Sequence, residues 1–352
     1  MDKNRFVEQL LAWYEENKRQ LPWRGTFDPY KIWLSEILLQ QTRVNQGLPY
    51  YLRFVKSYPT ISKLAKAPLG DVLRMWQGLG YYSRARNLHA CSKVIMKHWN
   101  GAFPPTFHEL KKLPGIGDYT AAAIASIAFR QPVAVVDGNV YRVLSRLLNI
   151  DTSISSPEGK KYFSELANSL IPKENPADFN QAMMEFGAIH CTPRNPKCDE
   201  CIFRKQCKGH QAERHLVLPV KSKILKRKKR YFNYFIIHDG NKTWMQKREE
   251  KDIWQGLYEF YLIESPKPIG QSTATKQFTA AARIKAEAVR LAASTKQLLS
   301  HQEIHGKFYE FARSKPNNVF RKGKFYSPKE IEKLAKPVII TRYLEQGASE
   351  KK

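Results

Sequence analysis

The sequence predicts an all-α domain over residues 1–212, followed by a smaller α+β domain over residues 231–345. In the first region, apolar residues recur at helical spacing, and Pro and Gly separate the segments. Beyond it, short runs rich in aromatic and β-branched residues are bounded by turn residues, as in strands. Residues 213–230 carry many Lys and Arg and no helical apolar stripe, which predicts a basic linker between the two domains.

The apolar patterns predict the residue ranges of the individual helices and strands. Helices are expected at 2–18, 29–46, 60–76, 83–98, 106–112, 118–130, 138–149, 157–170 and 177–190. In the second domain we expect strands at 231–238, 243–248 and 257–265, a helix near 275–292, strands near 299–312 and a short helix from Pro328.

The charge of the chain points to a polyanionic partner. The net charge of the 352 residues is +27, and basic residues outnumber acidic ones in both domains, so nucleic acid is the expected partner. No apolar run reaches the roughly 20 residues of a membrane helix. The first segment has acids inside its apolar pattern, which indicates an amphipathic helix rather than a signal peptide. We therefore expect no membrane contact and a cytoplasmic protein of the bacterial type that acts at the nucleoid.

Four of the five cysteines lie in one short loop with the spacing C-x6-C-x2-C-x5-C: Cys191, Cys198, Cys201 and Cys207. A reducing compartment disfavours two disulfides. Structural zinc sites usually contain two C-x2-C pairs, whereas this loop has one. Four thiolates in one loop suit a [4Fe–4S] cluster, and zinc remains the alternative.

Residues 113–140, LPGIGDYTAAAIASIAFRQPVAVVDGNV, contain a tight turn between two helix-like stretches. Gly115 and Gly117 let the backbone approach a phosphate, and the N–H groups of the turn and of the next helix can bind that anion. Such contacts position DNA without reading its sequence. An ordinary helix–helix turn is the alternative, but Leu113-Pro114 before the turn and the small residues after it favour a helix-hairpin-helix.

Two carboxyls have the properties of a pair that cleaves a glycosidic bond. Asp137 ends an apolar run before the helix 138–149, so it is expected to cap that helix and to stay ionised. Glu36 shares a helix face with apolar residues, and desolvation there would raise its pKa and keep a proton near neutral pH. One neutral and one ionised carboxyl can break a glycosidic C–N or C–O bond.

With these motifs in place, residues 1–212 resemble the helix-hairpin-helix, iron–sulfur DNA glycosylases. Within that superfamily, endonuclease III-like enzymes carry a lysine where this chain has Tyr119, and Tyr119 cannot form the imine of a lyase. The segments LPWR (21–24), WLSEILLQQT (33–42), GLGYYSRARNL (78–88) and VVDGNVYRVLSR (135–146) resemble instead the MutY-type adenine DNA glycosylases. That family removes adenine mispaired with 8-oxoguanine.

The resemblance implies a role for each matching residue. Glu36 would protonate N7 of adenine, Asp137 would stabilise the sugar cation or bond to it transiently, and Tyr119 and Asn139 would support that carboxylate and the sugar. Residues further from the chemistry would border the adenine pocket (Arg24, Leu39) or enter the duplex at the mispair (Gln41 beside Thr42, and Tyr81). A core aromatic is the alternative for Tyr81. For Arg84 and Arg86 we favour contacts to phosphates, and a solvated helix start is the alternative. The resemblance also favours the [4Fe–4S] cluster over zinc.

The second domain resembles the Nudix-like domain of the same family. The segment MQKREEKDIWQGLYEFYLIE (245–264) matches its glycine-containing stretch, but the acid cluster of a working Nudix hydrolase is missing after it. The family's Phe-Ser-His loop corresponds to Leu299-Ser300-His301. Ser300 and His301 are expected to contact 8-oxoguanine, whereas Leu299 replaces an intercalating aromatic residue.

These observations predict a monomeric, monofunctional glycosylase that acts on A:8-oxoguanine or A:G mispairs in double-stranded DNA and leaves the strand intact. A bifunctional glycosylase/lyase is one alternative, and the missing lysine argues against it. A non-catalytic DNA-binding iron–sulfur protein is the other, and it leaves Glu36 and Asp137 without a task.

Overall fold

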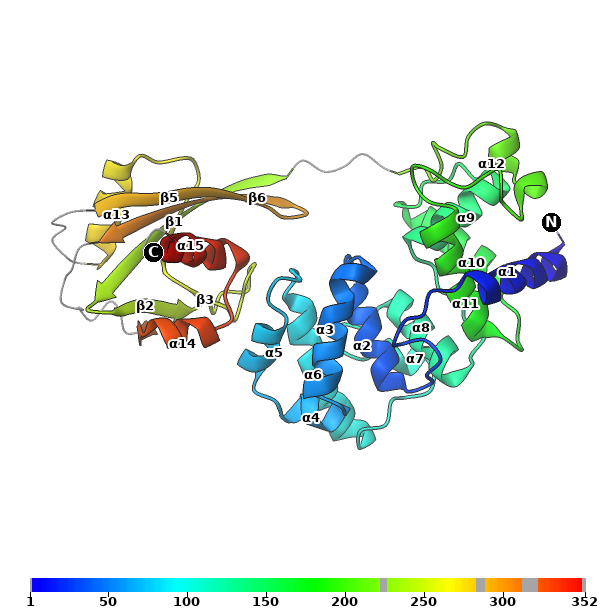
Figure 1. Cartoon of the computed structure of the whole chain (residues 1–352), viewed down its shortest axis with the longest axis horizontal. Coiled ribbons are helices and arrows are strands. Elements are labelled where there is room, and N and C mark those ends of the chain that lie inside the picture. Colours follow the sequence, from blue (N-terminus) through cyan, green and yellow to red (C-terminus); the bar gives the residue numbers. More distant parts are fainter. Residues whose placement is uncertain (1, 222–226, 283–288, 312–321, 350–352) are drawn as a thin grey trace. The chain divides into compact units, whose positions relative to one another are not determined.

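The computed structural model describes residues 2–221, 227–282, 289–311 and 322–349 (Figure 1). Contacts within the chain divide it into two compact units. The first contains Met1–Lys66 and Ala90–Lys223, and the second contains Ala67–His89 and Ile224–Lys352. Within the described ranges, no helix is both long and apolar enough to cross a bilayer.

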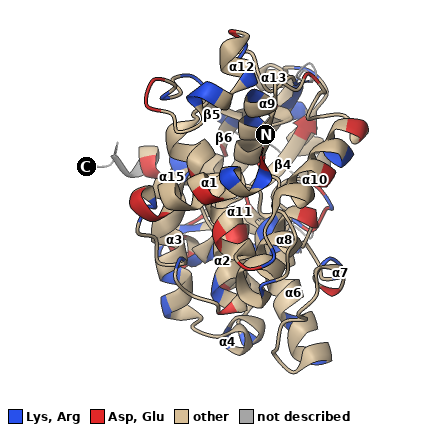
Figure 2. Ribbon diagram, turned by 90° about the vertical axis from the view of Figure 1, so that its right-hand side faces the viewer, with Lys and Arg blue, Asp and Glu red and all other residues tan. Residues whose placement is uncertain are grey.

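The first unit is helical. Its elements are α1 (Lys3–Asn17), α2 (Pro29–Leu39), α3 (Val44–Ser57), α4 (Ile61–Lys66), α7 (Phe107–Leu110), α8 (Asp118–Phe129), α9 (Gly138–Leu148), α10 (Pro157–Leu170), α11 (Pro176–Glu185) with a π-helical turn Phe186–His190, a 3-10 turn Arg204–Gln206, and α12 (Lys208–Gln211). The helix α5 (Leu69–Met75) lies in the second unit, and α6 (Ser83–Trp99) runs from the second unit into the first. Ribbons coloured by charge show Lys and Arg on many of these helices, with acidic residues between them (Figure 2).

Two expected helices are interrupted. The segment 29–46 forms α2 and the start of α3, because Gln41 adopts a left-handed backbone with φ 56° that no helix can contain. The segment 60–76 forms α4 and α5, with Pro68 at the N-cap of α5. We expect no helix between residues 47 and 59 from the sequence, yet α3 continues to Ser57 with Pro49 inside it.

One apolar core joins α1, α9, α10, α11 and the cysteine loop. Phe203, from between the last two cysteines of the loop, is 1% exposed and lies 5.0 Å from the Phe6 ring of α1 and 5.4 Å from Phe186. The buried Phe203 ring therefore anchors the loop, in addition to the metal group expected on its four thiols.

Asn180 of α11 fixes the extended segment that precedes α9. Its Oδ1 accepts a hydrogen bond from Val135 N at 2.9 Å, and its Nδ2 donates to Val133 O and Ser126 Oγ, both at 2.9 Å. Asn180 is 1% exposed, so no water replaces these bonds if the side chain is removed. This segment delivers Asp137 to the start of α9.

The second unit is built on a twisted sheet. Its strands are β1 (Lys228–Asp239), β2 (Lys242–Lys247), β3 (Tyr258–Glu259), β4 (Tyr261–Ser265), β5 (Val289–Leu298), β6 (Gln302–Phe311) and β7 (Gly323–Tyr326), and its further helices are α13 (Gln271–Ala282), α14 (Pro328–Lys333) and α15 (Val338–Ser349). The strand order is β3-β2-β1-β6-β5, with β4 paired to β1 and β7 to β2. Strands β1 and β6 are parallel, with Lys228 opposite Gln302.

Helices cover both faces of this sheet (Figure 1). On one face, Phe278 of α13 stacks on Phe235 at 4.2 Å between ring centroids. On the other face, Tyr343 of α15 stacks on Phe308 at 4.4 Å. The alternation of side chains along β1 and β6 provides aromatic residues to both layers, and β1 is buried on both faces through its middle.

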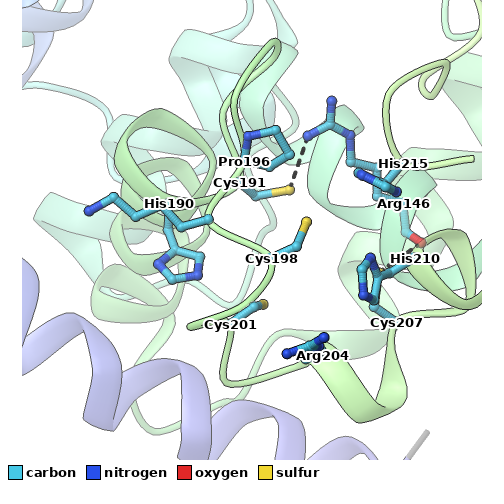
Figure 3. Close-up of a pocket in the computed structure, with 11 residues that line it drawn as sticks. Arg146, His190, Cys191, Pro196, Cys198, Cys201, Arg204, Cys207, His210 and His215 are labelled. Atoms are coloured by element: carbon cyan, nitrogen blue, oxygen red, sulfur yellow. Dashed lines mark hydrogen bonds between the residues drawn. The ribbon is translucent and has the colours of Figure 1, made fainter. Parts of the chain in front are cut away.

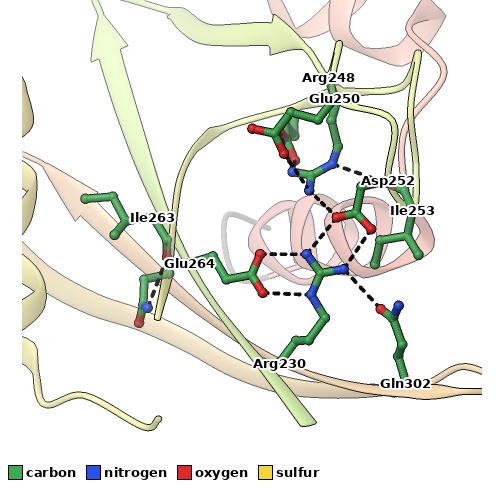
Figure 4. A network of polar contacts seen from close by, with 10 residues as sticks. Arg230, Arg248, Glu250, Asp252, Ile253, Ile263, Glu264 and Gln302 are labelled. Carbon is green, nitrogen blue, oxygen red and sulfur yellow. Dashed lines mark hydrogen bonds and ion pairs between the residues drawn. The ribbon is translucent and has the colours of Figure 1, made fainter. Parts of the chain in front are cut away.

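A network of charged residues lies beside β1 (Figure 4). Arg230 binds Glu264 and Asp252, each through a contact of 2.6 Å, and donates to Gln302 Oε1 at 3.1 Å. Arg248, 4% exposed, binds Asp252 as well. Buried guanidiniums need such acceptors, because an unpaired buried charge is strongly destabilising.

The second unit departs from the sequence prediction in three places. The helix expected near 275–292 ends at Ala282, and Val289 already belongs to β5; residues 283–288 lie outside the described ranges. The helix α15 was not expected. The linker predicted over 213–230 includes the first residues of β1, and residues 222–226 are outside the described ranges.

Replacing Asn180 by Ala removes three buried hydrogen bonds and leaves Val135 N and Val133 O without this partner. We expect the free energy of unfolding to fall by about 2–4 kcal/mol. The measurement is urea unfolding followed by circular dichroism. Asn168→Ala is the control, because exposed Asn168 makes a single bond to the same segment, at Ala134 N. Equal losses for the two variants would contradict the anchoring role of Asn180.

Candidate active site and cysteine loop

Glu36 lies in the middle of α2, among buried residues, and is 9% exposed. Burial raises the pKa of Glu36 to about 7; repulsion by Asp137 adds to the rise, and a hydrogen bond with Tyr119 opposes it. Tyr119 is in the first turn of α8, and its hydroxyl also donates to Met184 Sδ at 3.5 Å. Near neutral pH, Glu36 can therefore hold a proton beside the Tyr119 hydroxyl and the Asp137 carboxyl.

Asp137 is the N-cap of α9. Its Oδ1 accepts hydrogen bonds from Asn139 N and Val140 N, both at 2.8 Å, and its Oδ2 accepts one from Asn139 Nδ2 at 2.7 Å. Burial raises the pKa of Asp137, whereas these donors and Arg142 lower it. The helix dipole adds a positive potential at this end of α9.

The two carboxyls differ in what stabilises their charge. Asp137 accepts three N–H bonds at a helix N-terminus, whereas the hydrogen bond assigned to Glu36 comes from the Tyr119 hydroxyl. When one proton is shared between them, the charge therefore resides on Asp137 and the proton on Glu36. The site thus presents one acid and one carboxylate side by side.

Arg142 connects Asp137 to the cysteine loop. Its Nη2 donates to Asn139 Oδ1 at 2.8 Å and to Gly187 O at 2.6 Å, and its Nε donates to Cys191 O at 2.8 Å. One turn later, Arg146 donates to Thr192 O, Pro193 O and, at 3.5 Å, to Cys191 Sγ. The helix that begins at the carboxylate is therefore bonded along its length to the loop.

The predicted hairpin lies between α7 and α8. Gly115 has φ 76°, a conformation that favours glycine. Apart from its two chain neighbours, no described residue lies within 4 Å of the position that a Cβ on Gly117 would occupy, so the start of α8 is open on that side. Asp118 in the first turn of α8 forms an ion pair with Lys111. This geometry suits backbone contacts to a phosphate.

Gln41 and Tyr81 lie at exposed positions on tight loops. Both adopt left-handed backbone conformations, with φ 56° and 48°, and Tyr81 is 45% exposed. Such conformations are uncommon outside glycine and cost roughly 1–3 kcal/mol. Thr42 closes the first loop by donating from its N to Leu39 O at 3.0 Å. Leu39 itself packs against Gly47, where it leaves no room for a Cβ.

Three predicted arginines have partners within the protein. Arg24 binds Glu185 through two bonds, of 2.6 and 3.0 Å. Burial alone would raise the pKa of Glu185, but its hydrogen bonds with Arg19 and Arg24 outweigh it and hold the value at about 2. Arg84 lies over the rings of Trp76 and Tyr81, and Arg86 donates to Gln255 O at 2.8 Å within the second unit. Each guanidinium thus has a structural task besides any contact with DNA.

The four thiols of the loop line one cavity (Figure 3). Burial raises the pKa of the Cys201 thiol to about 12, and it also raises the pKa of Cys198 and Cys207. Because burial disfavours the ionised thiolates, they need a bound metal whose positive charge stabilises them. Phe203 N donates to Cys201 Sγ at 3.4 Å, as backbone groups do toward thiolate ligands. The loop therefore fits a [4Fe–4S] cluster held by Cys191, Cys198, Cys201 and Cys207.

Ser300 and His301 lie in the turn between β5 and β6, and both are exposed. The turn is closed by Leu299 N, which donates to Gln302 O at 2.8 Å, and is held to the start of β1 by Lys228 N, which donates to His301 O at 3.0 Å. Within the second unit, the hydroxyls of Tyr81 and Ser300 are hydrogen-bonded to each other. The predicted wedge residue and the predicted recognition turn are thus adjacent in this unit.

Sequence reasoning missed Arg142, Arg146 and Glu185. The two arginines are four residues apart in the helix that Asp137 begins, so they share one face of it, and this spacing was a usable signal. Glu185 gave no such signal, because its partners Arg19 and Arg24 are more than 160 residues away in the sequence.

Replacing Glu36 by Gln removes the titration of a buried group. Since the pKa of Glu36 is raised on folding from 4.5 to about 7, the native protein loses stability as the pH rises through this range. We expect Glu36→Gln to gain up to roughly 3 kcal/mol relative to the wild type between pH 4 and pH 8. Urea unfolding across this pH range measures the gain, and exposed Glu174→Gln serves as the control. A constant difference would refute the raised pKa.

Family models match three parts of the chain. Residues 34–172 match the HhH-GPD superfamily of base excision DNA repair proteins, residues 191–207 match the iron-sulfur binding domain of endonuclease III, and residues 233–346 match the NUDIX domain. The iron–sulfur match spans all four loop cysteines, so the expected cofactor is confirmed.

Similar proteins agree with these matches. The chain is 38% identical over 258 residues to the adenine DNA glycosylase of Buchnera aphidicola subsp. Schizaphis graminum, covering 72% of this chain and 74% of that protein. It is 43% identical over 215 residues to the adenine DNA glycosylase of Homo sapiens, covering 58% and 39%.

Among solved structures, a thermostable thymine-DNA glycosylase is 31% identical with a TM-score of 0.55, covering 60% of this chain and 97% of that one. A non-covalent endonuclease III–DNA complex is 24% identical with a TM-score of 0.52, with coverages of 60% and 98%, and shares the fold. Together, the helical fold, the four-cysteine loop and these relatives show that the chain belongs to the MutY-type adenine DNA glycosylases.

Proposed function

We propose that this protein hydrolyses the N-glycosidic bond of adenine mispaired with 8-oxoguanine or guanine in double-stranded DNA, and that it leaves the strand intact. The observation that carries the proposal is the pairing of the N-capping Asp137 carboxylate with buried Glu36, whose pKa burial raises to about 7. A neutral acid and an adjacent anion are what a base-leaving reaction requires.

In the proposed reaction, Glu36 protonates N7 of adenine, and the C1′–N9 bond breaks with its electron pair leaving on the base. The positive charge that develops on the deoxyribose is stabilised by Asp137, whose orientation is set by Asn139. Water then adds to C1′ and loses a proton, which leaves an abasic site. The field of Asp137 acts in a largely buried site, where electrostatic stabilisation is strong.

Tyr119 separates this chemistry from strand cleavage. A lyase forms an imine between an amine and C1′, and a phenol cannot do so. The Tyr119 hydroxyl is instead hydrogen-bonded to the Glu36 carboxyl, which holds this acid in place. The reaction therefore ends at the abasic site.

Gln41 and Tyr81 are proposed to enter the base stack at the mispair. Their left-handed backbones hold the side chains on exposed loop tips. Insertion of such groups offsets part of the cost of unstacking a flipped base. Gly115 and Gly117 would bind the backbone beside the lesion through N–H groups, with Thr42, Arg84 and Arg86 near the DNA.

Ser300 and His301 are proposed to contact 8-oxoguanine by hydrogen bonds. Arg230 supports this role, because it bonds Gln302 at the end of the turn and is itself held by Asp252 and Glu264. Arg227 also donates from Nε to Leu299 O at 2.9 Å. The turn is therefore held by Arg230 of β1 and by Arg227, which directly precedes that strand.

The four cysteines would hold a [4Fe–4S] cluster, which supplies a rigid charged centre for the loop. Arg194, Lys197, Arg204 and Lys205 lie between those cysteines and would face the DNA backbone. We infer further that the protein acts as a cytoplasmic monomer on duplex DNA.

A duplex with one adenine opposite 8-oxoguanine tests the activity. We expect loss of adenine and strand cleavage only after added alkali, read on a denaturing gel. A duplex with adenine opposite thymine is the control. Prompt cleavage without alkali would point to a lyase, and intact adenine would refute both enzymatic functions.

Asp137→Asn tests the carboxylate. Asn keeps the hydrogen bonds to Asn139 N and Val140 N, so the cap and DNA binding should persist while the excision rate falls by at least about 10²–10³-fold. Single-turnover excision and fluorescence anisotropy measure the two properties. Asp178→Asn, at the exposed start of α11, is the matched control. An active Asp137→Asn enzyme would remove this carboxylate from the mechanism.

A further inference from the structure

Two histidines lie close to one of the loop cysteines. The Sγ of Cys198 and a ring nitrogen of each of His210 and His215 all lie within 4.8 Å of one another. His210 belongs to α12, and His215 follows that helix. Figure 3 shows both imidazoles on the same side of Cys198, with His190 on the other side.

Each of these histidines has one ring nitrogen without a hydrogen-bond partner in the part of the chain that the structure describes. Among the residues that the structure describes, the buried Nδ1 atoms of His210 and His215 have no hydrogen-bond partner. Their ring centroids lie 5.2 Å apart with an interplanar angle of 63°, so the rings do not stack face to face. A buried polar atom without a partner costs about 1–3 kcal/mol, which a bound ion would recover.

The donor set is one thiolate and two imidazoles, which is typical of zinc-class cations. Ligands of a tetrahedral zinc ion are roughly 3.4–3.7 Å apart, so the three atoms need to approach by about 1 Å. Arg146, Lys197 and Arg204 line the same cavity. They repel a free cation but stabilise the Cys198 thiolate, so affinity must come from the ligand bonds themselves.

We propose that Cys198, His210 and His215 form a second metal site, which binds a zinc-class divalent cation when the loop holds no iron–sulfur cluster. Binding replaces the proton of the Cys198 thiol by the metal, and the two neutral imidazoles donate their lone pairs. Water completes the tetrahedron. Because the cluster also needs Cys198, the two metals exclude each other.

Competition follows from the shared thiol. A cluster-free chain that binds zinc at this site has lost one of the four cluster ligands. Zinc therefore blocks reassembly of the cluster until it is removed. His190 lines the same cavity but stacks on Phe186 at 4.8 Å and is outside the three-ligand set, which makes it an internal control.

Titration of the full-length, cluster-free protein with Co²⁺ tests the site. We expect tetrahedral d–d bands and a charge-transfer band with the intensity of one thiolate. Loss of a residue that only hydrogen-bonds to a metal ligand costs about 10–100-fold in metal affinity. The double variant His210→Gln, His215→Gln loses two ligands, so its affinity for Co²⁺ should fall by at least this factor. His190→Gln and Cys191→Ser should bind Co²⁺ as the wild type does.

Reconstitution provides the second measurement. With iron and sulfide alone, the wild type and the double histidine variant should both regain the brown cluster. With zinc added first, the wild type should regain far less, whereas the double variant should be unaffected. Co²⁺ binding that survives loss of both histidines but fails in Cys191→Ser would show a four-cysteine site and overturn the proposal. Equal inhibition of both proteins by zinc would overturn it as well.

Discussion

The buried guanidinium of Arg142 is the constraint on which the rest of this site depends. It bonds at once to Asn139, which orients the Asp137 carboxylate, and to the carbonyls of Gly187 and Cys191 at the start of the cysteine loop. A guanidinium has donors in a fixed plane, so these acceptors can only move together. The cysteine loop and the start of α9 are therefore held together by one side chain.

Burial raises the pKa of both carboxyls, but different groups oppose the rise. Asp137 recovers part of its lost solvation from a helix N-terminus and an amide, whereas Glu36 lies among apolar side chains with the Tyr119 hydroxyl. The asymmetry comes from backbone geometry rather than from the residue types. An acid and an anion can thus coexist within one pocket at neutral pH.

Much of this site was predictable because its signals are local. Asp137 before Gly138 indicated an N-cap, and the cysteine spacing indicated a metal loop. The break at Gln41 was not predictable, since the apolar pattern of 29–46 continues through it and only tertiary packing imposes its left-handed backbone. Residues 289–292 form strand rather than helix because β6 offers a pairing edge, which no local pattern reveals. The bonds of Arg24 to Glu185 likewise join distant segments.

The left-handed conformations of Gln41 and Tyr81 have a thermodynamic consequence. Their strain is already present in the free protein, so it is not added when DNA arrives. In the role proposed for these residues, the side chains would enter a base stack without backbone rearrangement, and the ordering entropy of binding would be reduced accordingly. The energy of the encounter would then be left for deforming the nucleic acid rather than for reshaping the loops.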